Sequence, residues 1–207
     1  MESSDITAEI RVAVLGDWLH PRLAGVLALQ RAKEPETIVT MMDSAASQSV
    51  RSPDDAIDFA LCNTDRSWPG WVSEPLWHDT LAVGVAKRSH LLAYSHVPCS
   101  EALKQPLIWA RSTADEPWRA EAEHLLGDVP QVRGQTVGTF DMTMTLVAAG
   151  YGVTIAPYAR LAGYVQRGIV MRPLAGAPAI ATVFLMRPQT LSSDHATRFL
   201  RRARSMR

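Results

Sequence analysis

The stretch that decides the fold runs from residue 146 to residue 157 and reads LVAAGYGVTIAP. It completes a helical pattern over residues 139–149, in which Phe140, Met144 and Val147 share one face. Gly150 can then take the left-handed backbone conformation that ends a helix. The apolar residues 153–156 that follow predict a strand. The stretch therefore predicts a helix, a glycine turn and a strand in direct succession.

Strands and helices also alternate toward the N-terminus. Strands are predicted over residues 10–15, 37–42 and 56–62. A first helix has Pro21 in its opening turn and ends at Glu34, because a residue before proline disfavours the helical region. A short second helix is predicted over residues 45–51. Such short connections imply right-handed crossovers and a mainly parallel sheet.

The second half of the chain begins with an extended run over residues 72–86, which is long enough to serve two sheets. After it we predict strands over residues 107–110, 131–137, 169–174 and 179–186. Helices are predicted over residues 118–126, 158–166 and 193–204. The sequence thus predicts an α/β fold, with a second lobe built after the long strand.

Composition narrows the class of protein. The chain has 207 residues, with 21 Lys and Arg against 21 Asp and Glu, so no net charge holds it on a phosphate backbone. The one basic cluster lies near the C-terminus, where spacing along a helix predicts a solvated face. Its members are Arg198, Arg201, Arg202, Arg204 and Arg207.

The cysteines and the N-terminal residues predict a cytoplasmic protein. There are two cysteines, and Cys62 lies in an apolar run where a buried thiol is common. Residues 1–9 are acidic and polar, unlike a secretory signal. No stretch approaches the roughly 20 apolar residues of a membrane span.

Four segments resemble the effector-binding domain of LysR-type transcriptional regulators. Residues 146–157 resemble its helix, glycine turn and strand, and residues 58–61 (DFAL) resemble its third strand. Residues 74–76 (EPL) resemble its approach to the second lobe, and residues 87–93 (KRSHLLA) the segment after the crossing. The four occur in order at compatible spacing, and the resemblance extends over nearly the whole chain.

The resemblance implies a fold like that of type 2 periplasmic binding proteins. Two Rossmann-like lobes, each with a central mainly parallel sheet, would be joined by two crossover strands. Lobe I would comprise residues 1–78 and 179–207, and lobe II residues 79–178. A small polar or anionic metabolite would bind in the cleft between the lobes and change their angle. The family's winged helix-turn-helix has no counterpart in this sequence.

The loops that follow the strands supply the predicted ligand contacts, because backbone N–H groups converge where strands lead into helices. Arg111 is the first choice for an anion clamp; the alternative is a surface arginine paired with Asp115 or Glu116. Ser44, Ser112 and Thr139 could instead be plain helix caps. The predicted ligand-binding residues are Gly16, Asp17, Trp18, Asp43, Ser44, Ala45, Asn63, Arg111, Ser112, Thr113, Gly138, Thr139 and Phe140.

Two acidic residues complicate the usual acidic effector. Asp17 and Asp43 would repel a carboxylate unless each is paired, which admits amine-bearing or neutral ligands. Trp18 and Phe140 could form an apolar or stacking wall of the pocket. The alternative for both is core packing, and for Phe140 it is favoured.

Signs of enzyme chemistry are missing from the sequence. The six histidines are scattered, without metal-ligand pairs at helical spacing, and no phosphate loop or nucleophile elbow occurs. His78 and Asp79 with Cys62 could be imagined as a cysteine-nucleophile site, but an inert buried thiol is commoner. We therefore predict neither enzyme activity, nor a cofactor, nor a metal.

The partners are predicted from the resemblance. A homodimer would use the helix over residues 19–32, and DNA would be reached only through an absent N-terminal domain or a partner regulator. The alternative is a free-standing protein-interaction or ligand-sequestering module of the same fold. A solute-binding transport protein or an enzyme on this fold is the weaker alternative.

Overall fold

The computed structural model describes residues 8–16, 18–42, 57–127, 134–176 and 180–206. The chain divides into two compact units. Unit 1 comprises Met1–His78 and Thr182–Arg207, and unit 2 comprises Asp79–Ala181. The chain passes between the units within two strands, β4 (Trp71–Ala86) and β9 (Ile180–Pro188).

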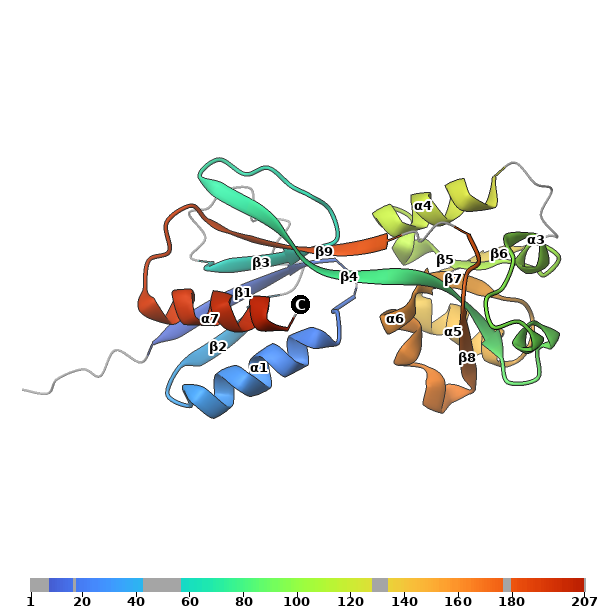
Figure 1. The fold of residues 1–207 in the computed structure, drawn as a ribbon, viewed down its shortest axis with the longest axis horizontal. Coiled ribbons are helices and arrows are strands. Elements are labelled where there is room, and N and C mark those ends of the chain that lie inside the picture. Colours follow the sequence, from blue (N-terminus) through green and yellow to red (C-terminus); the bar gives the residue numbers. More distant parts are fainter. Residues whose placement is uncertain (1–7, 17, 43–56, 128–133, 177–179, 207) are drawn as a thin grey trace, which may run out of the picture. The chain divides into compact units, whose positions relative to one another are not determined.

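Unit 1 is built on three parallel strands, the returning strand β9 and the first part of β4, which lies beside β9. β1 (Glu9–Leu15) pairs in parallel with both β2 (Ile38–Met42) and β3 (Phe59–Cys62). β9 pairs antiparallel with β3, which gives the order β2-β1-β3-β9 (Figure 1). The sheet is therefore mixed, because the returning strand β9 runs against its neighbour.

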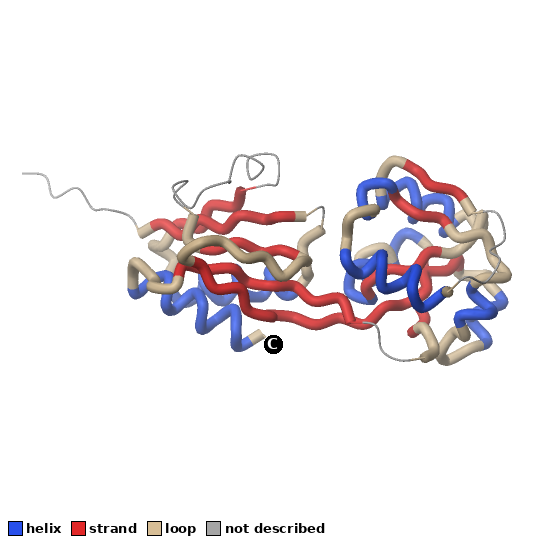
Figure 2. The backbone as a smooth tube through the Cα atoms, turned by 90° about the horizontal axis from the view of Figure 1, so that it is seen from above, coloured by secondary structure: helices blue, strands red, loops and turns tan. Residues whose placement is uncertain are grey.

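Two described helices cover one face of this sheet. They are α1 (Arg22–Lys33) and α7 (Asp194–Ser205), and Figure 2 shows both on one side of the strands. Phe59 packs on Phe199 beneath them, with ring centroids 5.0 Å apart. Alternate residues of the same strands, such as Ala13 and Ala60, face the opposite side. Each strand is therefore apolar on both faces, as its sequence indicates.

Unit 2 surrounds the second half of β4. This strand pairs antiparallel with β7 (Thr154–Pro157) and β8 (Ile169–Pro173). β5 (Ile108–Ala110) pairs in parallel with β6 (Gln135–Val137), and a parallel bridge joins Leu107 to Val153. The long extended run predicted over residues 72–86 is thus confirmed as a strand.

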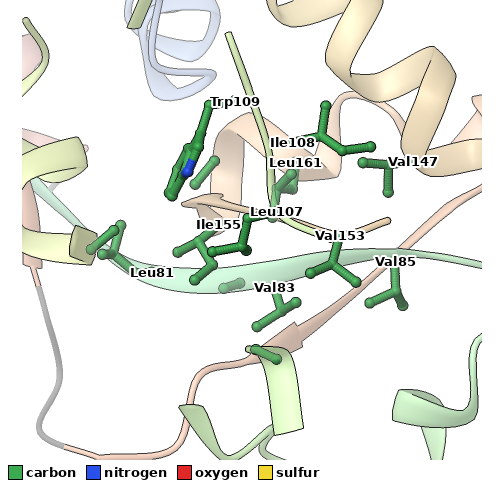
Figure 3. Close-up of a cluster of buried hydrophobic side chains, with 14 of the residues drawn as sticks. Leu81, Val83, Val85, Leu107, Ile108, Trp109, Val147, Val153, Ile155 and Leu161 are labelled. Carbon is green, nitrogen blue, oxygen red and sulfur yellow. The ribbon is translucent and has the colours of Figure 1, made fainter. Parts of the chain in front are cut away.

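Short helices complete unit 2. They are η1 (His90–Ala93), α3 (Cys99–Ala102), η2 (Arg111–Thr113), α4 (Pro117–Leu126), α5 (Phe140–Ala148), α6 (Tyr158–Ala162) and η3 (Val165–Arg167). Val83 and Ile155 are fully buried between them, and Figure 3 shows Leu107, Val147 and Leu161 directed into the same cluster. One contiguous apolar core therefore holds this unit together.

The stretch over residues 146–157 folds as predicted. α5 ends at Ala148, and Gly150 takes a φ of 85°, in the left-handed region. A Cβ on Gly152 would lie 2.2 Å from the carbonyl oxygen of Pro106. Ile108 and Val153 are joined there by backbone hydrogen bonding, with 2.8 Å between the Ile108 N and the Val153 O. The two glycines therefore serve different ends: Gly150 turns the chain, and Gly152 admits a neighbouring backbone.

Several predicted boundaries differ from the structure. The strand predicted over residues 56–62 begins only at Phe59. The helix predicted over residues 158–166 ends at Ala162, and a separate 3-10 turn begins at Val165. The sheets are mixed: β1 pairs in parallel with β2 and β3, and β5 with β6, whereas β9 and β4 pair antiparallel with β3, β7 and β8. The helix predicted over residues 45–51 lies outside the described residues.

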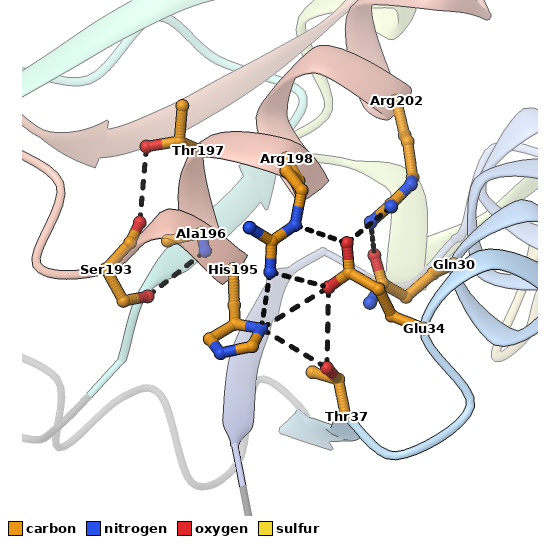
Figure 4. A network of polar contacts seen from close by, with 9 residues as sticks. All are labelled: Gln30, Glu34, Thr37, Ser193, His195, Ala196, Thr197, Arg198 and Arg202. Carbon is orange, nitrogen blue, oxygen red and sulfur yellow. Dashed lines mark hydrogen bonds and ion pairs between the residues drawn. The ribbon is translucent and has the colours of Figure 1, made fainter.

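The basic cluster on α7 is more than a solvated face. Glu34, at the end of α1, accepts hydrogen bonds at its Oε1 from Arg198 Nε and Arg202 Nη2, each at 2.5 Å (Figure 4). Arg204 binds Glu74 through two nitrogens, at 2.5 and 2.9 Å. The prediction of a solvated face is therefore wrong for Arg202, which is 12% exposed, whereas Arg198 and Arg204 form their ion pairs while still reaching solvent. They join α7 to α1 and to β4.

Candidate functional site

In unit 1, two predicted ligand loops meet at one edge of the sheet. Gly16 follows β1 and Asn63 follows β3, and the register pairs Leu15 with Cys62. Because β1 and β3 are parallel, both loops leave from their carboxyl ends, where α/β sheets commonly bind ligands. Trp18 and Asn63 line a small hollow at this edge. The structure thus brings together three of the predicted residues.

The hollow in unit 1 is lined mainly by aromatic and apolar side chains. Trp18 packs edge-on against His20 at 5.4 Å between ring centroids, and His20 lies 5.2 Å from Trp77. Its cavity volume is only about 10 Å³, roughly the room for one water molecule and far below the roughly 300–1,000 Å³ of pockets that enclose whole small ligands. Its own side chains therefore nearly fill it, and a ligand would meet its apolar walls only at the rim.

His20 is a member of this group that the sequence did not single out. Its Nδ1 accepts a hydrogen bond from the backbone N–H of Arg22 at 3.2 Å, at the first turn of α1. Burial lowers the pKa of His20 to about 4, and the nearby charge of Arg22 acts in the same direction. The ring is therefore neutral at pH 7. Its position between Trp18 and the strand depends on tertiary packing, which no local pattern reveals.

Cys62 closes the base of the same hollow. Its thiol donates to the carbonyl oxygen of Thr64 at 3.0 Å, and burial raises the pKa of the thiol to about 11. His78 contacts Thr182 at 3.0 Å, and Asp79 accepts the backbone N–H of Ala159 at 2.6 Å. Cys62 is thus held in the thiol form near neutral pH, whereas the thiolate is the nucleophilic form of a cysteine.

In unit 2, the two other predicted loops also meet. β5 leads into Arg111 and β6 into Gly138, and the register pairs Ala110 with Val137. The backbone N–H of Ser112 donates to the carbonyl oxygen of Gly138 at 3.3 Å, which ties the loops together. The side chains of Arg111, Ser112 and Thr139 are exposed at this edge. One cation and two hydroxyls are therefore exposed at the carboxyl ends of two parallel strands.

The alternative role of Arg111, pairing with Asp115 or Glu116, stays a prediction. Among the described residues of unit 2, Arg119 is bound by Glu123 at 2.6 Å, and Arg167 is bound by Asp141. Arg111 is exposed, and its role as an anion clamp stays a prediction.

Three predicted residues have structural roles in unit 2. Thr139 is the N-cap of α5 and accepts the backbone N–H of Met142 at 3.3 Å, so its hydroxyl is partly engaged. Thr113 is buried and donates to the carbonyl oxygen of Ala110 at 2.9 Å. Phe140 is buried beneath Arg160, whose guanidinium carbon lies 3.9 Å from the ring centroid. Phe140 therefore packs in the core, which was the favoured alternative to a role in the pocket wall.

The remaining predicted residues cannot be placed. Asp17, Asp43, Ser44 and Ala45 lie outside the described residues.

Within the described part of the chain, no three His, Cys, Asp or Glu side chains are grouped to hold a metal ion. No described helix is long and apolar enough to cross a membrane. The prediction that one ligand contacts the loops of both lobes stays a prediction.

Comparison with known proteins gives one family. The family described as the LysR substrate binding domain matches residues 3–206. No curated protein sequence matches the chain.

Solved structures share the fold at low sequence identity. The BenM effector binding domain with its effector benzoate is 17% identical, has a TM-score of 0.77, and is matched over 96% of this chain and 91% of its own. The regulatory domain of MetR from N. meningitidis is 15% identical, with a TM-score of 0.68 over 96% and 93%. Full-length CbnR in complex with its target DNA is 14% identical, with a TM-score of 0.79 over 97% and 70%.

Proposed function

Since the chain belongs to the family of LysR substrate binding domains, we propose that it senses a small organic effector through the loops at the carboxyl ends of β1, β3, β5 and β6. The family consists of regulator domains and is not a family of enzymes. The observation that carries the proposal is the convergence of these loops in pairs, Gly16 with Asn63 and Arg111 with Gly138. Each pair leaves parallel strands at the edge where such sheets bind ligands.

The side chains at these loops favour a carboxylate with an apolar body. The exposed guanidinium of Arg111 matches a carboxylate with two parallel hydrogen bonds, and Ser112 adds a hydroxyl beside it. Trp18 and Asn63 line the small hollow of unit 1, whose apolar wall would contact the body of such a ligand at the rim. Asp17 and Asp43 add negative charge to the sequence of two loops, so amine-bearing ligands form the second class to test.

A ligand screen tests the proposal directly. Aromatic and aliphatic carboxylates, amino acids and amines are added to the purified chain, and the melting temperature is measured at several concentrations. A ligand that binds only the folded chain raises the melting temperature as its concentration rises. We expect a carboxylate to do so, and calorimetry then gives its Kd.

Matched variants locate the site. Arg111→Gln removes the proposed clamp, and we expect Kd to rise by about tenfold or more, as for the loss of a charge-assisted pair. Arg201→Gln removes an exposed arginine of α7 and should leave Kd unchanged. Trp18→Ala tests the loops of unit 1 separately. Binding that survives both Arg111→Gln and Trp18→Ala would contradict the proposed site.

We further propose that the chain forms a homodimer through α1 and the edge strand β2. A groove lies between them in unit 1, lined by apolar side chains that include Leu27 and Val39. Ile38 is 54% exposed and Met41 39% exposed beside it. An edge strand with unpaired backbone groups and exposed apolar residues readily pairs with a second chain. A second copy of this chain is the proposed occupant.

Sedimentation at micromolar concentration tests the dimer. We expect a dimer mass for the wild type and a monomer mass for Ile38→Lys. Ile180→Lys is the matched control, since Ile180 is equally exposed, at 54%, but lies in unit 2. A clean monomer mass for the wild type would remove this part of the proposal.

The output of sensing is proposed to be transcription regulation in the cytoplasm. CbnR, a relative of the same fold, is found in complex with its target DNA. DNA would be reached through an N-terminal domain or a partner regulator, since the chain itself has no net charge.

Substrate turnover by the purified chain would favour an enzyme instead. Co-purification with a protein and no effector would favour an interaction module.

A further inference from the structure

A second hollow lies in unit 2, away from the proposed effector loops. It has about 1060 Å³ of empty space, open solvent included. Two segments singled out in the sequence line it: the turn after β4, with Lys87 and Arg88, and the glycine turn after α5, with Gly150 and Gly152. Neither segment takes part in the proposed effector site.

The hollow lies at the opposite edge of the unit 2 sheets. Gln105 precedes β5 and Val153 precedes β7, and both line the hollow. β5 and β7 run in the same direction, because their preceding residues Leu107 and Val153 form a parallel bridge. The hollow is therefore at the amino ends of these strands, whereas Arg111 follows the carboxyl end of β5. The two sites are separate.

One wall of the hollow is a tight turn that carries positive charge. The backbone N–H of Ser89 donates to the carbonyl oxygen of Ala86 at 3.0 Å, which places Lys87 and Arg88 at the corner of the turn. Ser89 Oγ accepts the backbone N–H of Leu91 at 3.2 Å and fixes the chain beyond it. The side chains of Lys87, Arg88 and His90 line the hollow from this turn.

The opposite wall is backbone with small side chains. Gly152 approaches the carbonyl oxygen of Pro106 too closely to bear a side chain, and the backbone N–H of Val153 donates to that oxygen at 2.9 Å. Ala148 and Ala149 complete this wall. The small residues of this wall leave the hollow open, and the backbone hydrogen bond between Val153 and Pro106 fixes the wall in place.

Among the described residues, the charged side chains that line the hollow are all basic. Its lining includes no aspartate or glutamate. Among the described ion pairs, none involves Lys87, Arg88 or His90, and the nearby Lys104 is held by Glu101 at 2.6 Å. Two cations beside an open hollow attract anions. Although the chain has no net charge, Lys87 and Arg88 place two positive charges beside this hollow.

We propose that this hollow binds a small, multiply charged anion, such as a phosphate ester or a tricarboxylate, independently of the effector loops. The recess favours a compact ligand over the backbone of a nucleic acid, which needs a longer positive surface. Lys87 and Arg88 donate charge-assisted hydrogen bonds, Gln105 offers a neutral donor, and the glycine turn leaves room for the ligand.

Titration calorimetry with the full chain at low ionic strength tests the proposal. The probes are pyrophosphate, inorganic phosphate and citrate. We expect saturable binding of at least one probe, weakened by added salt. Lys87→Gln with Arg88→Gln should weaken it about tenfold or more, the order expected for two lost charge-assisted contacts. If pyrophosphate and phosphate bind and citrate does not, the ligand class is phosphates; the reverse identifies carboxylates.

Three control variants test whether the anion binds in this hollow and not elsewhere on the chain. Lys33→Gln with Arg201→Gln removes the same charge from exposed positions of unit 1, and binding should persist. Ala149→Phe fills the hollow without changing charge, and binding should be lost while the melting temperature is kept. Arg111→Gln should have no effect. The proposal is overturned if no probe binds, if both charge-removing pairs weaken binding equally, or if Arg111→Gln abolishes it.

Discussion

Replacing Glu34 by glutamine should destabilise unit 1 strongly, although it only exchanges one carboxylate oxygen for an amide NH2 group. The carboxylate lies at the C-terminal end of α1, and its side chain is 8% exposed. Oε1 accepts Arg198 Nε and Arg202 Nη2 at 2.5 Å, and Oε2 is 3.4 Å from the Thr37 hydroxyl. Glutamine keeps the shape of the side chain but not its charge, and its NH2 group cannot accept a hydrogen bond from an arginine as the carboxylate oxygen does.

The magnitude follows from the exposure of each arginine. Arg202 is 12% exposed, so its charge-assisted bond contributes about 1.5–2 kcal/mol. Arg198 is 34% exposed and is screened by solvent, so its bond adds little. We therefore expect Glu34→Gln to lower the free energy of unfolding by about 2 kcal/mol. For a chain of this size the melting temperature should fall by about 4–8 °C.

The loss should also depend on pH. The hydrogen bonds from Arg198, and then those from Arg202 and His195, hold the pKa of Glu34 well below its ordinary value of 4.5, against the effect of burial. A group with a lowered pKa in the folded state stabilises fully above its unfolded pKa, and this contribution is lost as the pH falls below it. The wild type and Glu34→Gln should therefore differ most near pH 7 and converge below pH 4.5.

Thermal and urea unfolding between pH 7 and pH 3.5 measure this difference. Glu121→Gln is the matched control, since Glu121 is exposed on α4 and no described ion pair involves it. The control should change stability by less than about 0.5 kcal/mol. A Glu34→Gln protein as stable as the control at pH 7, or one whose deficit grows as the pH falls, would refute the reasoning.

Three other predictions concern single positions. His20→Gln should reduce the loss of stability between pH 6.5 and pH 4, measured by urea unfolding, because the pKa of His20 is lowered to about 4 and the unfolded chain takes up the proton first. Gly152→Ala should lower the free energy of unfolding by about 2 kcal/mol or more, since its Cβ would meet the Pro106 oxygen at 2.2 Å; Gly163→Ala, with 3.5 Å to its nearest neighbour, should change it little. Cys62 should react with a thiol reagent at pH 8 only on unfolding, since burial raises its pKa to about 11, and fast reaction of the folded chain would contradict this.

Much of unit 1 and unit 2 could be predicted from local sequence. The helix around Val147 and the strand after Gly152 follow from apolar spacing and from the glycine that ends the helix. The α/β class and the order of elements followed in the same way. The direction of β9 relative to β3 could not be predicted so, because strand pairing between distant segments leaves no periodic mark in either one.

The candidate site was predicted in its loops but not in its side chains. Arg111 and Gly138 follow their strands, so their proximity required only that β5 and β6 be parallel. Phe140 and Thr113 come from the same loops, yet both are buried in the core of unit 2. A side chain in a loop is directed by the neighbours it packs on, and for Phe140 that neighbour is Arg160, twenty residues further along the chain.

The sequence by itself determined the class of fold, the family and the positions of the turns, since these depend on residue spacing and on glycine conformation over a few neighbours. Only the tertiary structure decided which charges are engaged. Arg198 and Arg202 are held by Glu34, more than 160 residues away, whereas Lys87 and Arg88 face an open hollow. The physical reason is that the energy of a charge depends on what surrounds it in space, and a neutral chain can still separate its positive and negative groups.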